Sequence, residues 1–361
     1  KPYLSNRVQL IPASHIQIRP ILWLWPGWLA AGKLHILAGS AGTGKTNIAL
    51  FMAATISKGG FGGKRWPDNS FAPDGHVVIW TGEDSVEETI IPRLKALGAD
   101  LERVHILKGT EENGRAVRPF DFAKDIELLS NEMARLGDVK LVIIDSIVQA
   151  VAGDSNKNSE VRKALEPLVE KAEKHNCAIV GITHLAKGSK TKDPLDRVAG
   201  SMAFGAVARV VLVTAKVKSE YSSDEPPRCV IVRAKSNIGL DVGGFEYSIA
   251  SADFQEESGV HISTAIISFG SAIEGTARDI LKNAENGDEG GKTSKVDVAA
   301  DFLFEMLSNG SVAQAEIEAR AVHCGISVAA IKRAKKSLGI VSHDDFQRPI
   351  KVIREQCPAG P

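Results

Sequence analysis

The residues with the clearest chemistry lie at positions 39–46, which read Gly-Ser-Ala-Gly-Thr-Gly-Lys-Thr. Glycines in such a loop let backbone N–H groups converge on the β- and γ-phosphates of a nucleotide at a helix N-terminus. Lys45 adds a positive charge, and the hydroxyl of Thr46 can bind Mg²⁺. An apolar run (34–38) and a helical pattern (47–57) flank the loop, so the sequence predicts a nucleoside triphosphatase that uses ATP and Mg²⁺. The predicted nucleotide-binding residues of the loop are Gly39, Ser40, Ala41, Gly42, Thr43, Gly44, Lys45 and Thr46.

Carboxylates follow two other apolar runs, at the strand ends where this loop is expected to open. Asp145 ends the run 141–145 and is predicted to hold Mg²⁺ through water. Many ring ATPases place the glutamate that orients the attacking water directly after this aspartate, but here the position is Ser146. Glu83 is predicted to take that role, with Asp84 in reserve, because neighbouring parallel strands open at one edge of a sheet. Both acids would also suit the N-terminus of the helix that follows them.

Further along the chain, polar and basic side chains complete the predicted catalytic set. His184 follows the run 178–183 and is predicted to touch the γ-phosphate, although an isolated histidine is more often structural. Positive charge from a neighbouring subunit would complete the site, and the candidates are Arg209, Arg233 and Lys235. The last two alternate along one strand and so share a face. Spacing alone does not separate a residue that acts in trans from a surface ion pair.

Two polar loops are expected to leave the sheet on the side of the phosphate loop. The first spans 152–159, after the magnesium strand, and the second spans 186–199, after His184. The second loop is basic and is predicted to bind the phosphates of single-stranded DNA; a solvated loop without a ligand is the alternative. The predicted DNA-binding residues of this loop are Lys187, Lys190, Lys192 and Arg197.

The elements that must position these residues alternate between short β-branched runs and helical patterns. Strands that are apolar on both faces, separated by helices, indicate a parallel sheet covered on both sides. Fewer helices separate the later runs, so the sheet is expected to end in an antiparallel part. The predicted strands are 34–38, 77–81, 104–107, 141–145, 178–183, 209–213, 230–234 and 245–249, and the predicted helices are 47–57, 86–97, 122–136 and 161–175.

The composition changes after this region. Residues 283–295 contain no large apolar side chain and are predicted to be a flexible linker between an ATPase domain (1–282) and a smaller domain (296–361). Three helical patterns and a tail with β character then follow, an order typical of a helix-turn-helix with a wing. The third pattern, 328–338, carries basic residues and no acid, so contact with duplex DNA is favoured over a merely solvated face. These residues are Lys332, Arg333, Lys335 and Lys336.

Whole-chain composition limits the classes of function. The chain has 44 lysines and arginines and 44 aspartates and glutamates, so any contact with nucleic acid must be local. Its four cysteines show no metal-type spacing and fit reduced thiols in the cytoplasm. The apolar stretch 21–25 is too short to cross a membrane. Its tryptophans are expected to pack at the edge of the core rather than to stack on bases.

In this order, the motifs resemble the RecA-like ATPase family, in particular the hexameric replicative helicases of the plasmid RepA type and their relatives on mobile elements. The unit after the linker looks like the winged-helix tail of many mobile-element members. The first resemblance covers about residues 23–249. Besides the phosphate loop and the run 141–145, it rests on Trp23-Leu24-Trp25-Pro26-Gly27, Gly82-Glu83-Asp84, Thr183-His184-Leu185-Ala186-Lys187-Gly188, Ala199-Gly200-Ser201 and Arg233-Ala234-Lys235-Ser236-Asn237-Ile238-Gly239.

The resemblance implies a RecA-like P-loop fold, a catalytic glutamate at Glu83, a γ-phosphate sensor at His184 and DNA-binding loops in the two polar stretches. It also implies charges from the neighbouring subunit, at Lys235 and at an arginine. In the related DnaB-type helicases that arginine follows the lysine by two positions, but here the position is Asn237. Arg209 is therefore the preferred substitute, and Arg233 is the reserve.

The function predicted from these features is an ATP-dependent DNA motor, a homo-hexameric replicative helicase of a plasmid, phage or integrated element. An ATP-switched DNA-binding regulator or helicase loader that does not unwind DNA is the main alternative, and the predicted winged helix favours it. A recombinase- or clock-like RecA relative that forms filaments or signalling rings is a third. A metabolic kinase is disfavoured, because the sequence shows no lid or second substrate pocket.

Overall fold

The computed structural model describes residues 8, 10–112, 115–151, 153–186, 188, 192–198, 202–218 and 226–286, and, nearer the C-terminus, residues 299, 302–304, 306–307, 312–323, 326–327, 331–332, 334–335, 338 and 340. The chain divides into two compact units. The first comprises residues 1–217 and 221–285, and the second comprises residues 218–220 and 286–361.

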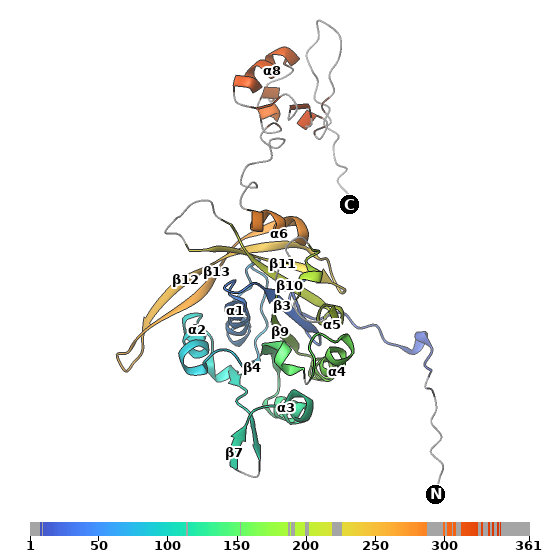
Figure 1. Cartoon of the computed structure of the whole chain (residues 1–361), viewed down its shortest axis with the longest axis vertical. Helices are drawn as coiled ribbons and strands as arrows, with labels where there is room; N and C mark the ends of the chain where they lie inside the picture. Colours follow the sequence, from blue (N-terminus) through green and yellow to red (C-terminus); the bar gives the residue numbers. More distant parts are fainter. Residues whose placement is uncertain are drawn as a thin grey trace. The chain divides into compact units, whose positions relative to one another are not determined.

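A nine-stranded sheet forms the centre of the first unit (Figure 1), with strand order β13-β12-β11-β10-β3-β9-β8-β4-β5. Neighbouring strands from β10 to β5 are parallel, whereas β11, β12 and β13 are antiparallel to their neighbours. The predicted α/β fold, a mostly parallel sheet with an antiparallel end, is therefore confirmed. The strands of this sheet are β3 (Leu34–Gly39), β4 (His76–Thr81), β5 (Val104–Ile106), β8 (Val139–Asp145), β9 (Ala178–His184), β10 (Val210–Lys216), β11 (Arg228–Ser236), β12 (Val242–Gln255) and β13 (His261–Thr276).

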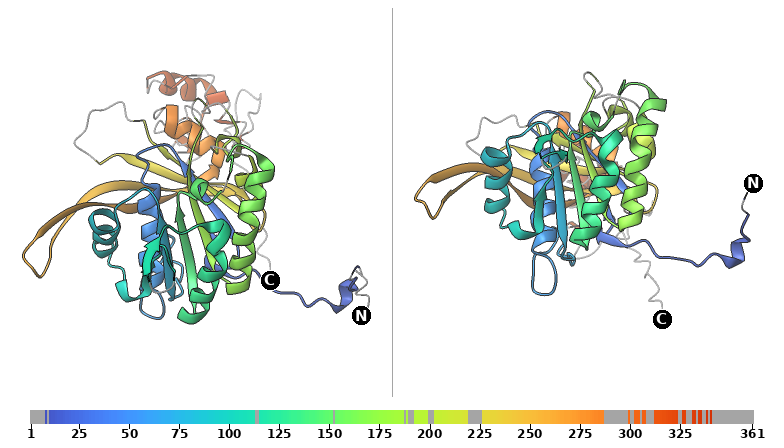
Figure 2. Two further views of the ribbon diagram at one scale, coloured as in Figure 1. Left: turned by 60° about the horizontal axis from the view of Figure 1, so that its bottom comes forward. Right: turned by 90° about the horizontal axis from the view of Figure 1, so that it is seen from below.

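Helices cover both faces of this sheet (Figure 2), which explains why β3, β8, β9 and β10 are apolar on both sides. One face packs against α1 and α2, and the other packs against α3, α4, α5 and α6. These helices are α1 (Lys45–Ser57), α2 (Ile91–Ala96), α3 (Phe122–Leu136), α4 (Asn158–His175), α5 (Met202–Val207) and α6 (Ala277–Asn286). The helix predicted over 86–97 is a π-helical turn, η2 (Val86–Ile90), that runs into α2.

Short elements complete the first unit. Two small hairpins are formed by β1 (Trp23–Trp25) with β2 (Leu29–Ala30), and by β6 (Thr110–Glu112) with β7 (Arg115–Arg118). The 3₁₀ turns are η1 (Ala13–His15), η3 (Leu101–Arg103), η4 (Ile147–Ala150) and η5 (Leu195–Arg197).

Tryptophans of the first hairpin pack in the core, as predicted. Trp25 is fully buried and stacks between Trp28 and Trp66, with ring centroids 5.0 Å and 4.9 Å away. Phe245 and Phe269 of the antiparallel strands lie against the same ring. Offset stacking adds to the burial of apolar area, so this cluster ties the start of the domain to its last two strands.

The long hairpin of β12 and β13 was predicted only in part, as the run 245–249. It extends well beyond the rest of the sheet (Figures 1 and 2). The hairpin also contacts α2, where Lys95 forms an ion pair with Glu256 at 2.7 Å. Strand β13 was missed, because serine, threonine and glycine interrupt its apolar residues and weaken the strand pattern.

The described residues of the second unit surround a small apolar core. Helix α8 (Gln314–His323) overlaps the second of the three predicted helical patterns, 311–322, and its Ile317 is buried in this core. The core residues are Ala299, Leu303, Leu307, Ile317, Ala321, Ile326, Ile331 and Ala334. The tail with β character that was predicted to form the wing, residues 347–354, lies outside the described residues. The predicted linker begins too early, since α6 continues to Asn286.

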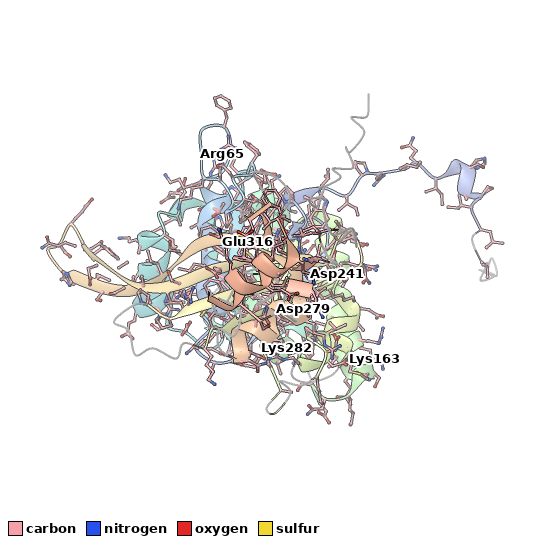
Figure 3. All side chains as sticks on the ribbon, turned by 90° about the horizontal axis from the view of Figure 1, so that it is seen from above. Arg65, Lys163, Asp241, Asp279, Lys282 and Glu316 are labelled. Atoms are coloured by element: carbon pink, nitrogen blue, oxygen red, sulfur yellow. The ribbon has the colours of Figure 1, made fainter. Side chains whose placement is uncertain are left out.

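Residues 10–22 form a segment that runs clear of the sheet, with its side chains exposed (Figure 3). Several of these side chains are large and apolar, including Leu10, Ile18 and Leu22. In the described part of the chain, no helix combines the length and the apolar character that crossing a membrane requires.

Candidate active site

The phosphate loop joins the end of β3 to the start of α1 and needs glycine for its shape. Gly42 and Gly44 have φ values of +71° and +74°, which side chains on L-residues rarely adopt. Helix α1 begins at Lys45, so its unpaired backbone N–H groups and the positive end of its dipole face the loop. This is the arrangement that binds phosphates.

Two residues from late strands hold this loop, and neither was predicted. The hydroxyl of Thr214 on β10 lies 2.7 Å from that of Thr43, and the hydroxyl of Tyr247 on β12 donates to the Thr43 carbonyl at 2.5 Å. Gly39 has no room for a side chain, since a Cβ there would lie 1.9 Å from the Thr214 hydroxyl. Only the strand pairing brings these residues together, so no local sequence signal could have identified them.

The predicted magnesium ligands are in contact. The hydroxyl of Thr46 donates to Oδ2 of Asp145 at 2.7 Å. Burial, aided by the nearby charges of Glu83 and Asp84, raises the pKa of Asp145 to about 6. One hydroxyl and one carboxylate suit Mg²⁺, which prefers oxygen and takes further ligands from water and substrate phosphates. Among the described residues, no group of three or more His, Cys, Asp or Glu side chains forms a self-sufficient metal site.

A stability measurement tests the cost of burying the charged carboxylate of Asp145. In protein without Mg²⁺ or nucleotide, Asp145→Asn is expected to raise the free energy of unfolding at pH 8 by about 1–3 kcal/mol. The folded protein binds more protons than the unfolded chain between the ordinary pKa of 3.8 and the raised value of about 6. The free energy of unfolding of the wild-type protein therefore falls as the pH rises through this window, and it stays lower above the window. Asparagine carries no charge at any of these pH values, so the variant does not lose this stability.

Thermal unfolding at pH 8 and at pH 4 measures this effect, and the gain should shrink toward pH 4. Asp253→Asn, an exposed aspartate on β12, is the control and should change little. If Asp145→Asn is instead less stable than the wild-type protein at pH 8, the charged carboxylate of Asp145 does not destabilise the fold.

Glu83 and Asp84 follow β4 and differ in their surroundings. The turn that carries them is tied to the magnesium strand, because the Gly82 N–H donates to the Asp145 carbonyl at 2.7 Å. Asp84 lies 3.5 Å from Arg93 in an ion pair. Glu83 is exposed and forms no ion pair with any residue that the structure describes. Desolvation lowers the pKa of Lys45 and of His184, and the charge of Glu83 partly opposes both shifts; the same charge adds to the burial that raises the pKa of Asp145, so Glu83 lies within electrostatic reach of all three.

Lys45 and His184 lie side by side at the ends of α1 and β9. Lys45 Nζ donates to the Ser40 carbonyl at 3.2 Å and lies 3.4 Å from Nδ1 of His184. Burial lowers the pKa of Lys45. Desolvation, with the Lys45 charge second, lowers the pKa of His184 and favours its neutral form. The structure thus brings Lys45, Thr46, Glu83, Asp145 and His184 together.

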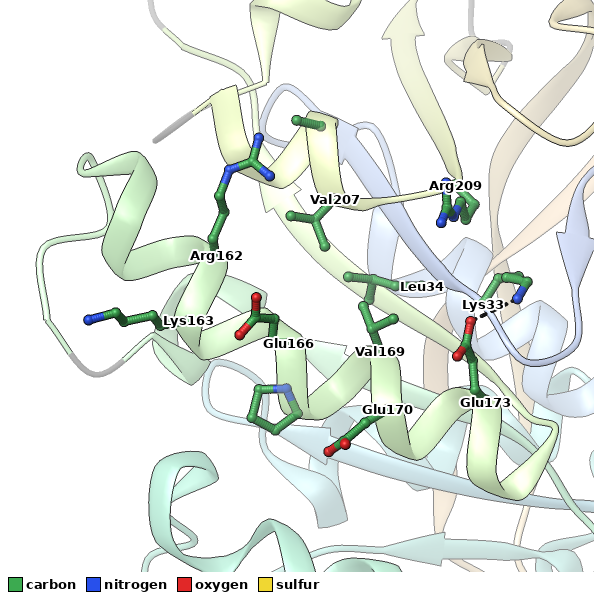
Figure 4. A pocket seen from close by; sticks show the side chains of 12 residues that line it. Lys33, Leu34, Arg162, Lys163, Glu166, Val169, Glu170, Glu173, Val207 and Arg209 are labelled. Carbon is green, nitrogen blue, oxygen red and sulfur yellow. Dashed lines mark hydrogen bonds and ion pairs between the residues drawn. The ribbon is translucent and has the colours of Figure 1, made fainter. Parts of the chain in front are cut away.

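Arg209 and Lys235 lie at the opposite end of the parallel strands, where β10 begins and β11 ends. The Lys235 ammonium donates to the carbonyls of Gly205, Ala206 and Ala208 at the C-terminal end of α5. All three of its donors are therefore used within its own chain, which does not support a contact in trans. Arg209 is exposed and lines a groove of about 650 Å³ with Lys33, Leu34, Val207 and residues of α4 (Figure 4).

Arg233 also has partners in its own chain. Its guanidinium lies 4.6 Å from the ring of Trp28 and donates to the carbonyls of Gly27 and Val242. This packing holds the first hairpin against the antiparallel strands. The reserve assignment of Arg233 as a residue that acts in trans is therefore not supported, and Arg209 is the exposed member of the three candidates.

The predicted DNA-binding residues of the basic loop are only partly described. Lys187 and Lys190 lie outside the described residues, and Lys192 is exposed. The prediction for Arg197 does not fit the structure, because its side chain is 3% exposed and its guanidinium pairs with Glu285 of α6. The apolar neighbour Val198 is buried as well, so the end of this loop packs into the domain.

The predicted DNA-binding residues of the second unit are also only partly described, and only one of the two described residues is exposed. Lys332 is exposed, whereas Lys335 is 9% exposed and follows Ala334 of the small core. Lys335 therefore does not present its ammonium freely, contrary to the prediction. Arg333 and Lys336 lie outside the described residues.

Comparison with known proteins identifies a family for this chain. A model of the family described as AAA domain matches residues 6–190. The match includes the phosphate loop, Glu83, Asp145 and His184. No match was found among the curated proteins.

Proposed function

The chain belongs to the AAA domain family, and from this premise we propose that it is an ATP-dependent DNA motor, a ring-forming replicative helicase of the plasmid RepA type. The observation that carries the proposal is the convergence of Lys45, Thr46, Glu83, Asp145 and His184 around the phosphate loop. These groups meet the needs of triphosphate hydrolysis: charge on the phosphates, a metal anchor and a carboxylate for water.

Each side chain has a part in this chemistry. Thr46 and Asp145 would hold Mg²⁺, which neutralises charge on the β- and γ-phosphate oxygens when bound. The Lys45 ammonium binds the same phosphates at the start of α1. Glu83 accepts a hydrogen bond from the attacking water and orients it in line with the bond that breaks. His184, kept neutral by its surroundings, contacts the γ-phosphate and changes partner when that phosphate leaves.

The exposed position of Arg209 supports a shared active site in a homo-hexamer. Because Arg209 lies at the end of the strands opposite its own phosphate loop, it would act on the loop of a neighbouring subunit. Such a residue stabilises charge that develops on the phosphates in the transition state. The polar stretches 152–159 and 186–199 follow β8 and β9, which end at Asp145 and His184, so single-stranded DNA would bind against these stretches.

Two assays on wild-type protein test the motor. Turnover of ATP is expected to rise several-fold with single-stranded DNA, and strand separation of a forked duplex is expected to require ATP and Mg²⁺. Solution mass with ATP and single-stranded DNA should correspond to a ring. If the protein remains a monomer under all conditions, an active site shared between subunits is excluded.

A DNA-binding regulator or helicase loader is the second candidate. The separate apolar core of the second unit favours it, because a motor needs no unit that reads duplex sequence. Stimulated ATP turnover without any strand separation on the fork would support this candidate over the motor.

A further inference from the structure

Lys216 lies beside the phosphate loop and belongs to no recognisable nucleotide-binding motif. Strand β10 is parallel to β3 (Figure 1), and its register places Thr214 opposite Gly39. Lys216 ends β10 two residues later, alongside the loop that follows Gly39. A Cβ placed on Gly42 would lie 2.9 Å from Nζ of Lys216, so this ammonium group touches the backbone of the loop.

The ammonium group of Lys216 is available to a ligand. Its side chain is exposed, and it forms no hydrogen bond or ion pair with the residues that the structure describes. Ser40 and Gly42 of the adjacent loop are exposed too. A lysine here adds a second positive charge to the loop besides Lys45, and an anion bound by the loop would lie within its reach.

The strand order indicates which part of a nucleotide Lys216 meets. Asp145 and His184 end β8 and β9, and Glu83 follows the end of β4 by two residues; these three strands all lie on one side of β3. Lys216 ends β10, on the other side of β3. The γ-phosphate must lie toward the three catalytic groups. The opposite side of the loop therefore faces the α-phosphate end of the polyphosphate, which ATP and ADP share.

We infer that Lys216 binds the α-phosphate end of the nucleotide and holds substrate and product alike. The inference rests on the proposed ATP hydrolysis and adds a residue to its binding site. An interaction that is equal in the ground state and the transition state lowers KM without changing kcat. Lys216 therefore differs in its effect from Glu83 and His184, which act at the γ-phosphate.

Nucleotide affinities of Lys216→Ala test the inference. Competition of ATP and of ADP against a fluorescent ADP analogue, without DNA, is expected to show both Kd values raised about tenfold, the effect of losing one charge-assisted contact at an exposed site. The KM for ATP should rise by a similar factor, with kcat within about twofold. Lys216→Arg should keep both affinities, because it keeps the positive charge.

Lys218→Ala is the matched control, since Lys218 is also exposed and lies two residues further along the chain. It should leave both affinities unchanged. Unchanged ATP and ADP affinities in Lys216→Ala, or a loss confined to binding of a labelled single strand, would overturn the inference. A wild-type protein that hydrolyses ATP without stimulation by DNA would instead argue against the motor and leave the role of Lys216 intact.

Discussion

Replacing Glu83 with glutamine is expected to lower the turnover of ATP by about two to four orders of magnitude while ATP still binds. Glutamine keeps the size of the side chain but accepts a proton far more weakly. Glu83 is exposed, unpaired among the described residues and close enough to influence Lys45, Asp145 and His184. Steady-state release of phosphate measures turnover, and binding of a fluorescent ATP analogue shows that the site remains.

Asp84→Asn is the matched control for this change. Asp84 is adjacent to Glu83 but already pairs with Arg93 at 3.5 Å, so its loss should reduce turnover only about twofold to tenfold through a less ordered turn. If Asp84→Asn abolishes turnover and Glu83→Gln does not, the roles of the two carboxylates are exchanged. If neither substitution abolishes turnover, another group orients the attacking water.

The second large effect is expected for Lys45→Ala, which should reduce kcat/KM for ATP by a factor of about one thousand or more. The lysine is 7% exposed, and burial lowers its pKa. Without a ligand its ammonium donates to the Ser40 carbonyl and lies beside His184. The phosphates of a bound nucleotide would offset the desolvation of the Lys45 ammonium group. Its charge is therefore expected to stabilise the bound nucleotide and, most of all, the transition state.

Lys58→Ala provides the comparison for Lys45→Ala. Lys58 directly follows the other end of the same helix and is exposed. Its removal should leave kcat/KM within about twofold. Undiminished turnover in Lys45→Ala would exclude the phosphate loop as the hydrolytic site.

The central part of this fold could be predicted because its signals are local. Strand β8 is a run of apolar residues that ends in a carboxylate, and α3 shows a regular helical pattern. The phosphate loop and the order of strands then place Lys45, Asp145 and Glu83 at one edge of the sheet.

Residues that depend on distant partners could not be predicted in this way. The sequence shows Arg197 in a basic stretch, but only the packing of α6 reveals Glu285 beside it. Arg233 and Lys235 alternate on one strand, yet their partners come from the first hairpin and from α5. Thr214 and Tyr247 lie far from the loop along the chain and reach it only through strand pairing.

The stacked indoles of the first unit have a spectroscopic consequence. All five tryptophans of the chain, at positions 23, 25, 28, 66 and 80, belong to the first unit, and the second unit has none. Selective excitation of indole therefore reports on the ATPase unit alone, so its unfolding can be followed in the intact chain without interference. Trp80 directly precedes Thr81, which accepts the backbone N–H groups of Glu83 and Asp84, and its emission should respond when nucleotide reorders that turn.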